Sequence, residues 1–133
     1  MITKSDVIEE VVKAFDYLVQ LNYSHEAYDA GPEYGVIFRS KKRNRVIQII
    51  LKAFTGGIME CTITRLYPKY FPFIYTSFND KVFILINEKF KVDKEFCDFN
   101  APITVDNKRE VINSYAKFVE TRLAGIISGE SWG

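Results

Sequence analysis

The chain contains a single histidine, His25, in the segment YSHEAYD. Imidazole is the proton carrier in Ser-His-Asp and Cys-His mechanisms, so any catalysis of that type must use this residue. Cys61 and Cys97 are the candidate thiols, and Cys61 falls on the apolar face of a predicted strand. We expect His25 to be a surface or edge-strand residue, and we predict that the protein is not an enzyme.

Metal and phosphate sites find little support in the sequence. The two cysteines lie far apart, and with one histidine they lack the close ligand pairs of a structural zinc site. Gly56 and Gly57 belong to no GxGxxG or GxxxxGK[ST] motif, and no predicted helix begins after them. The acidic pair Glu9 and Glu10 is typical of a solvated helix face. We therefore expect no metal and no cofactor.

The densest charge cluster is the predicted turn Lys41-Lys42-Arg43-Asn44-Arg45. Such a turn can contact phosphates, or it can simply remain solvated and discourage edge pairing. The net charge of +1 and the lack of an RNA-binding fingerprint argue against nucleic acid. We predict that Lys41, Lys42 and Arg43 contribute to a protein-binding surface.

An aromatic segment, PKYFPFIYTSF, is the second candidate for recognition. Pro68 and Pro72 stiffen it and prevent regular strand pairing, so some of its rings should lie at the surface or over the second face of the sheet. Rigid, tyrosine-rich surfaces bind partners at a low cost in entropy. The alternative is a small satellite core beneath a long loop. The predicted partner-binding aromatic residues are Tyr67, Tyr70, Phe71, Phe73 and Tyr75.

Composition limits the class of protein. The 133 residues suffice for one domain, spanning 1–133, and the values of 47% hydrophobic and 26% charged residues are those of a globular chain. No apolar run reaches the roughly 20 residues that cross a bilayer. The first residues carry acids where a secretion signal carries basic residues. We expect a cytoplasmic protein that does not bind membranes.

The predicted centre of the fold is a β-hairpin formed by RVIQIILKAF and IMECTITRLY. Odd-numbered positions are apolar in both runs, so the two strands must pair odd to odd for these residues to share a face. A three-residue loop, 55–57, achieves this by placing Leu51 opposite Cys61 and Lys52 opposite Glu60. A two-residue turn would place Lys52 opposite Cys61, and we reject it.

The remaining elements surround this hairpin. Amphipathic helices are predicted over 4–21, with Thr3 and Asp6 as a capping box, and over 107–128, with Asn107 and Glu110 as a cap pair and Gly129 as the stop. A weak edge strand is predicted over 23–29 and a stronger strand over 34–40. The segment 73–78 could pair with 82–87, although the second run could also be a buried helical turn. Residues 89–102 are predicted to form a loop.

These elements predict an α+β fold, with an antiparallel sheet of about four to six strands packed against the N- and C-terminal helices in a two-layer sandwich. Both helices should cover the odd face of the hairpin. The even face carries apolar residues too, so an aromatic cover or a partner could lie there.

The order of elements resembles that of small bacterial immunity-type proteins encoded beside polymorphic toxins. The resemblance lies in the strands GVIFRS and RVIQIIL and in the last helix, SYAKFVETRLAGIISGESW. In these proteins the final helix often ends in a leucine-rich segment, a glycine and an acidic residue. The matching positions are Leu123, Ile126, Ile127, Gly129 and Glu130. Many such proteins are acidic, whereas this chain is near neutral, which argues against a basic nuclease as its partner.

The resemblance implies a protein that binds and blocks a toxin domain without catalysis. We therefore expect a cytoplasmic, protein-binding domain of the immunity or antitoxin type. The alternative is a small-ligand-binding module with an aromatic pocket between the sheet and the helices. The sequence is also compatible with a homo-oligomer.

Overall fold

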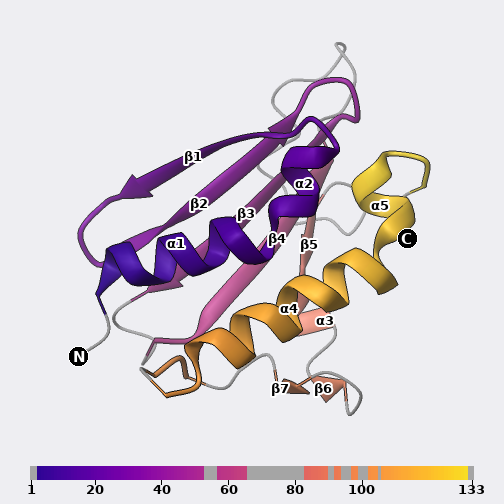
Figure 1. The fold of residues 1–133 in the computed structure, drawn as a ribbon. Helices are drawn as coiled ribbons and strands as arrows, with labels where there is room; N and C mark the ends of the chain where they lie inside the picture. Colours follow the sequence, from indigo (N-terminus) through magenta and orange to yellow (C-terminus); the bar gives the residue numbers. More distant parts are fainter. Residues whose placement is uncertain are drawn as a thin grey trace.

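The computed structural model describes residues 3–52, 57–65, 83–89, 92–93, 97–98, 102–104 and 106–131. They form one five-stranded antiparallel sheet in the order β1-β2-β3-β4-β5, with the helices on one face (Figure 1). The strands are β1 (Ser24–Asp29), β2 (Glu33–Ser40), β3 (Arg45–Lys52), β4 (Met59–Arg65) and β5 (Phe83–Leu85). The helices are α1 (Lys4–Ala14), α2 (Asp16–Gln20), α3 (Ile86–Lys89), α4 (Lys108–Arg122) and α5 (Ala124–Ser128). The predicted α+β fold is confirmed.

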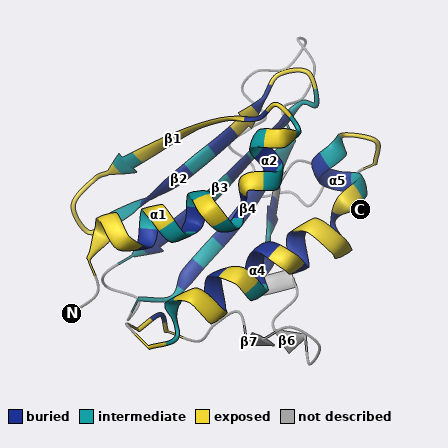
Figure 2. Ribbon diagram, viewed as in Figure 1, coloured by how far each residue is buried: buried dark blue, intermediate teal, exposed yellow. Residues whose placement is uncertain are grey.

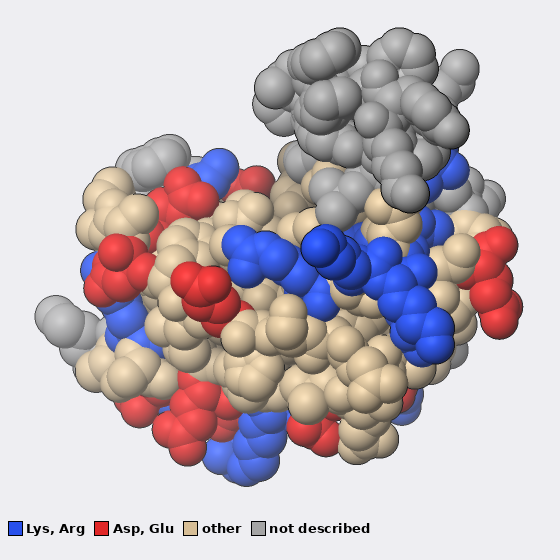
Figure 3. Space-filling model, turned by 90° about the horizontal axis from the view of Figure 1, so that it is seen from above, with Lys and Arg blue, Asp and Glu red and all other residues tan. Residues whose placement is uncertain are grey.

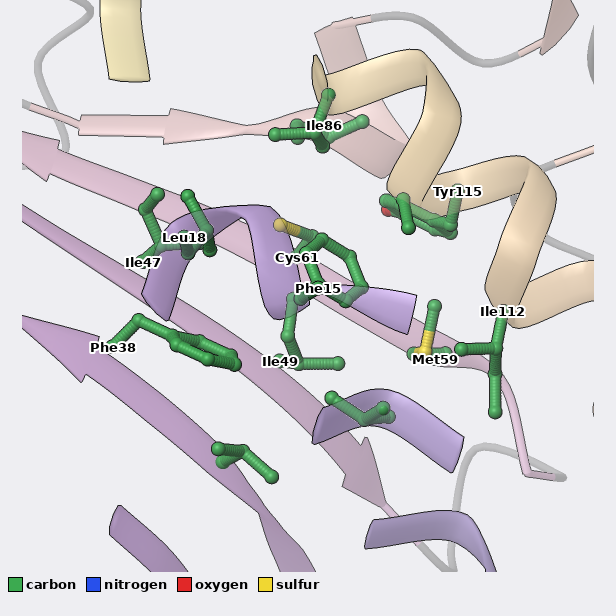
Figure 4. Close-up of a cluster of buried hydrophobic side chains, with 14 of the residues drawn as sticks. Phe15, Leu18, Phe38, Ile47, Ile49, Met59, Cys61, Ile86, Ile112 and Tyr115 are labelled. Carbon is green, nitrogen blue, oxygen red and sulfur yellow. The ribbon is translucent and has the colours of Figure 1, made fainter. Parts of the chain in front are cut away.

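The hydrophobic core lies between the sheet and the helices. Side chains alternate along a strand, so odd-numbered residues of β3 and β4 all face the helices, and we call this side the inner face. Figure 4 shows Cys61 and Ile49 of this face next to Phe15, Ile47 beside Leu18, and Met59 beside Ile112. Burial follows the same pattern, because the helices are dark on the side towards the sheet and exposed on the other (Figure 2).

The N-terminal helix is capped as predicted but is not continuous. Thr3 adopts an extended conformation, and its hydroxyl accepts a hydrogen bond from the backbone N–H of Asp6. Val7 and Val11 then point into the core. The prediction of one helix over 4–21 is wrong at Phe15, where α1 ends and the chain bends into α2. The bend buries the Phe15 ring against Phe38.

The C-terminal helix differs from its prediction at two points. Asn107 does not cap α4 with its side chain, because its carboxamide accepts from the N–H of Thr104 and donates to the carbonyl of Pro102. The predicted span of 107–128 is divided at Leu123 into α4 and α5. Gly129 ends α5 in a left-handed conformation with φ of 85°, as predicted. No helix in the described part of the chain is long and apolar enough to cross a bilayer.

The central hairpin has the predicted parity but a different register. Leu51 pairs with Met59 and Ile49 with Cys61, two positions away from the predicted pairing. Leu51–Met59 is the last pair of the ladder, so the connection between the two strands is longer than the predicted three residues. Ile58 belongs to this connection and forms an antiparallel bridge with Pro102. Lys52 and Glu60 are diagonal neighbours rather than opposed, yet their charged atoms still approach to 3.5 Å.

The other predicted strands are largely confirmed. Residues 41–44 form a four-residue turn between Ser40 and Arg45, which puts Val36 and Phe38 on the inner face with Ile47. The weak edge strand forms β1 and pairs with β2. The run 82–87 was predicted to be either a strand or a buried helical turn, and each prediction is correct in part. Three residues form β5, and the chain then turns into α3. The predicted strand 73–78 lies outside the described residues.

The predicted loop over 89–102 contains a small ribbon. Two-residue strands, β6 (Val92–Asp93) and β7 (Cys97–Asp98), pair with each other and not with the main sheet. The prediction of an unstructured segment is therefore wrong at these positions. Strands this short were missed because charge and aromatic residues alternate there without a clear period.

Asn87 continues the edge of the sheet after β5 has ended. β5 is only three residues long, so the outward backbone groups of β4 at Cys61 and Met59 have no strand beside them. The Asn87 carboxamide supplies both partners, accepting from the Cys61 N–H at 3.2 Å and donating to the Met59 carbonyl at 2.8 Å. Its oxygen also accepts from the Tyr115 hydroxyl. Further along, the N–H of Ile103 donates to the Gly57 carbonyl.

We predict that Asn87→Leu lowers the free energy of unfolding by about 3 kcal/mol or more, because it removes three hydrogen bonds made to two backbone groups and a hydroxyl in the core. Tyr115→Phe removes only one of these bonds and should cost about 1 kcal/mol. Urea unfolding of the two variants measures both values. Equal losses would mean that Asn87 does not hold the β4 edge.

Candidate protein-binding site

His25 and Cys61, which a Cys-His mechanism would have to combine, do not come together. His25 is exposed on β1, and its ring lies 5.9 Å from that of Phe38. Cys61 is on β4, three strand spacings away, or about 14 Å. Burial raises the pKa of the Cys61 thiol far above its ordinary value, so it stays protonated and cannot act as a nucleophile. The side chain of Cys97 is outside the described part of the structure.

The described residues offer little that could bind a small molecule or an ion. These residues contain no group of three or more His, Cys, Asp or Glu side chains that could hold a metal. A wide, shallow depression of about 650 Å³ where α1 meets α2 is lined by Glu9, Val12, Lys13 and Asp16. The lining carries both acidic and basic side chains, and none of the predicted partner-binding residues belongs to it. Glu10, predicted to be solvated, is half-buried and accepts from Arg109 at 3.3 Å.

The outer face of the sheet, away from the helices, is less open than its sequence suggests. Ile50 and Thr62 are buried there, with 7% of each exposed, and Ile37 and Val46 are half-buried. Ile50 and Thr62 therefore offer a partner little surface, whereas Ile37 and Val46 beside them are partly exposed. We therefore look for the candidate site at the ends and edges of the sheet.

The basic turn between β2 and β3 has an ordered backbone. The Ser40 hydroxyl accepts from the N–H of Arg43 at 3.1 Å, and the N–H of Asn44 donates to the Lys41 carbonyl at 3.2 Å. Asn44 has a φ of 61°, a conformation that asparagine tolerates better than most residues. Lys41 and Lys42 are exposed on this turn.

Arg45 is not part of the exposed charge, although it completes the basic sequence. Only 4% of it is exposed, and its guanidinium donates to four backbone carbonyls. Two of these lie in its own turn, at Arg43 and Asn44, at 3.2 and 3.0 Å. The other two are at Ile126, within α5, and at Ser131, three residues beyond the end of α5, at 2.8 and 2.9 Å. Arg45 thus joins two segments about 80 residues apart in sequence.

The direction of α5 suits this contact. The last carbonyls of a helix carry a partial negative charge, so a buried cation beside them is well placed. Burial lowers the pKa of the Arg45 guanidinium, but an arginine side chain remains charged at neutral pH. The positive charge is therefore compensated by oriented carbonyl groups together with its other neighbours.

Gly129 allows the end of α5 to lie directly on the turn. A Cβ atom at this position would come within 2.9 Å of the Arg43 carbonyl oxygen and 3.2 Å of the Arg43 Cα atom. Its positive φ is also unfavourable for other residues. The glycine that ends the helix is therefore also required for close packing against the turn.

Tyr23 provides a second tie to α5. Its hydroxyl donates to the Ile127 carbonyl at 2.6 Å, and only 3% of the residue is exposed. Burial raises the pKa of Tyr23 to about 12, while the nearby cations Arg45 and Arg43 lower it. Tyr23 therefore remains a neutral hydrogen-bond donor throughout the physiological pH range.

The exposed side chains around the contact between the turn 41–44 and α5 are mainly basic. Figure 3 views the molecule from this end, where Lys and Arg side chains form a band and Asp and Glu side chains lie mostly to either side. Arg39 forms an ion pair of 3.5 Å with Glu26, but both side chains are exposed, so the pair is weak. Lys41 and Lys42 make no ion pair or hydrogen bond with the described residues. We call the set the basic end, formed by the exposed Arg39, Lys41 and Lys42 and the half-buried Arg43 and Arg65.

The predicted aromatic residues of the partner-binding surface, Tyr67, Tyr70, Phe71, Phe73 and Tyr75, lie outside the described residues. The two described residues that flank this stretch are Arg65 and Phe83. Arg65 pairs with Arg45, and Phe83 pairs with Thr64, so both positions are at the basic end of the sheet.

Arg45 and Tyr23 are the site residues that sequence reasoning missed. In the sequence, Arg45 is one of four cations in the basic cluster 41–45. The one signal was its odd number, which places it in series with Ile47 and Ile49 on the inner face. The position of Tyr23 against α5 had no signal in the sequence, since it depends on a contact across the fold.

No family model matches the chain, and neither a curated protein nor a solved structure is significantly similar to it.

We predict that Tyr23 makes the protein sensitive to alkaline pH. Its folded pKa of about 12 lies above the unfolded value of about 10, so the folded state retains the proton more strongly. This contribution is fully present below pH 10 and is lost as the pH rises from about 10 to 12. The wild type should lose about 2 kcal/mol more than Tyr23→Phe over this range. Urea unfolding at several pH values measures the difference, and equal losses would contradict the assignment.

Proposed function

We propose that this chain is a non-enzymatic protein-binding domain that holds an acidic surface of another protein at its basic end. The observation that carries the proposal is the pair of exposed lysines, Lys41 and Lys42, on a turn whose backbone is fixed by Arg45. An ordered backbone reduces the entropy lost when a partner binds. Opposite charge on the partner would raise the association rate and select the orientation of binding.

Arg43 adds unused hydrogen-bonding capacity to this surface. Its side chain is half-buried, and its Nε atom has no hydrogen-bond partner among the described residues. A buried donor without an acceptor is unfavourable by about 1 to 3 kcal/mol. A partner carboxylate that drew this guanidinium outward would remove that penalty and gain a strong, charge-assisted bond.

The proposed partner is a toxin domain with an acidic binding face. This choice rests on the resemblance to immunity-type proteins, in which the partner is a toxin, and on the sign of the charge at the basic end. The near-neutral net charge of +1 favours local recognition of a protein over general attraction to nucleic acid. We also place the protein in the cytoplasm, where the free thiol of Cys61 would remain reduced.

A catalytic role receives less support from the structure than binding does. The thiol of Cys61 is buried and lies three strands away from His25, so these two residues do not form a nucleophile–base pair. A small-ligand pocket between the layers is also disfavoured, because the described part of that space is filled by large side chains. Those with less than 2% exposure include Phe15, Phe38 and Tyr115.

The test is to search the genes adjacent to this one for a toxin-like C-terminal domain and to measure binding between that domain and this chain. We expect a complex by isothermal titration calorimetry that Lys41→Glu/Lys42→Glu weakens at least about tenfold, since two opposed charge pairs become repulsive. The affinity of the wild type should fall as salt is added.

The matched control is Lys13→Glu/Lys117→Glu, which makes the same change in net charge on the exposed faces of α1 and α4. This variant should bind like the wild type. Absence of a complex with the neighbouring toxin domain would reject the partner. An equal effect of both double variants would reject the basic end as the surface. Tight binding of a nucleic acid by the wild type, lost in Lys41→Glu/Lys42→Glu, would replace the proposal.

A further inference from the structure

The first strand, β1, leaves one edge of the sheet open. Among the described residues it pairs with β2 on one side and with no strand on the other. Most of β1 is exposed, in contrast to the buried strands beside it (Figure 2). An exposed strand edge offers a row of unpaired backbone groups to another strand.

The hydrogen-bonding pattern identifies which backbone groups are available. The N–H of Ala30 donates to the Glu33 carbonyl at the turn between β1 and β2. In an antiparallel ladder every second pair exchanges hydrogen bonds, so Tyr28, Glu26 and Ser24 bond to β2. The N–H and C=O groups of the alternate residues therefore point outward. These residues are His25, Ala27 and Asp29.

We propose that β1 pairs with β1 of a second copy of this chain, antiparallel and centred on Ala27, to form a continuous ten-stranded sheet. A two-fold axis perpendicular to the sheet keeps the inner faces of both copies on the same side. Ala27 then pairs with Ala27 of the second copy, and His25 pairs with its Asp29. All the outward groups of these three residues find partners.

Charge complementarity selects this register. His25 and Asp29 both lie on the inner face, so pairing brings an imidazole beside a carboxylate twice in the dimer. Asp29 Oδ1 already accepts from Lys4 and from the N–H of Gly31, at 2.8 and 3.0 Å, while Oδ2 has no partner among the described residues. A register centred on Glu26 would instead oppose two glutamates, which is unfavourable.

The described surroundings of β1 leave room for the second copy. The inner-face residues of β1, His25, Ala27 and Asp29, are all exposed, because α1 packs over β2 rather than over β1. Ala27 is small enough for two copies to meet at the axis. The net charge of only +1 for each chain gives little long-range repulsion between copies.

The pairing is independent of the proposed function but has a consequence for it. Ser24 of β1 pairs with Arg39 of β2, so β1 begins at the basic end. Antiparallel pairing would therefore place the two basic ends at opposite ends of the dimer, where each remains free to bind a partner. Because one pair of six-residue strands is a small interface, the dimer should dissociate on dilution.

Sedimentation velocity over a range of protein concentrations tests the pairing. We expect the wild type to pass from monomer to dimer as concentration rises. Ala27→Pro removes an outward N–H without affecting a bond to β2, so the monomer should fold and the dissociation constant should rise at least about tenfold. Ala27→Ser keeps the N–H and should behave like the wild type. Circular dichroism establishes that each variant is folded.

Two further measurements distinguish this dimer from other associations. His25→Glu opposes Asp29 of the second copy with a like charge and should raise the dissociation constant roughly tenfold. Amide hydrogen exchange should show protection of His25, Ala27 and Asp29 only at high concentration. A wild type that stays monomeric at every concentration would overturn the proposal. So would a dimer that Ala27→Pro leaves intact, or one that protects other amides instead.

Discussion

The buried guanidinium of Arg45 is the interaction on which the arrangement of the candidate site depends. A buried charge without hydrogen-bond partners is strongly unfavourable. The guanidinium of Arg45 can therefore be buried only when the carbonyls of the turn 41–44 and those at Ile126 and Ser131 are in place. The bonds run to backbone carbonyls, and planar arginine provides five donors for them where lysine provides three on one atom. The same contact fixes both the turn that carries Lys41 and Lys42 and the end of α5.

The two edges of the sheet differ in how they are protected. The β4 side is closed in stages, first by β5, then by the side chain of Asn87, and then by backbone near Ile103. The β1 side has no comparable cover among the described residues and carries exposed charges instead. This difference separates the two surfaces proposed for binding, because the open edge suits a strand and the basic end suits an acidic side-chain surface.

The alternation of apolar residues predicted the fold class and the inner face of the hairpin, since parity is a property of the local sequence. It did not predict the register, because the pairing of Lys52 with Glu60 is satisfied equally by a diagonal contact. The roles of Asn87 and Arg45 were also missed. Each depends on backbone groups contributed by a distant segment, and a polar residue in a short sequence window does not reveal that segment. Of the predicted site, Lys41, Lys42 and Arg43 are brought together on one ordered turn.

Native-state hydrogen exchange on Arg45→Met tests the central claim most directly. If Arg45 joins the turn to α5, the amides of Asn44 and Ile127 should lose protection together, by about 1.5 kcal/mol or more. Amides in the middle of β3 and β4 should lose protection only by the fall in global stability. The control Lys42→Met should leave all of these amides unchanged. Loss of protection in α5 alone, with the turn as stable as in the wild type, would contradict the account.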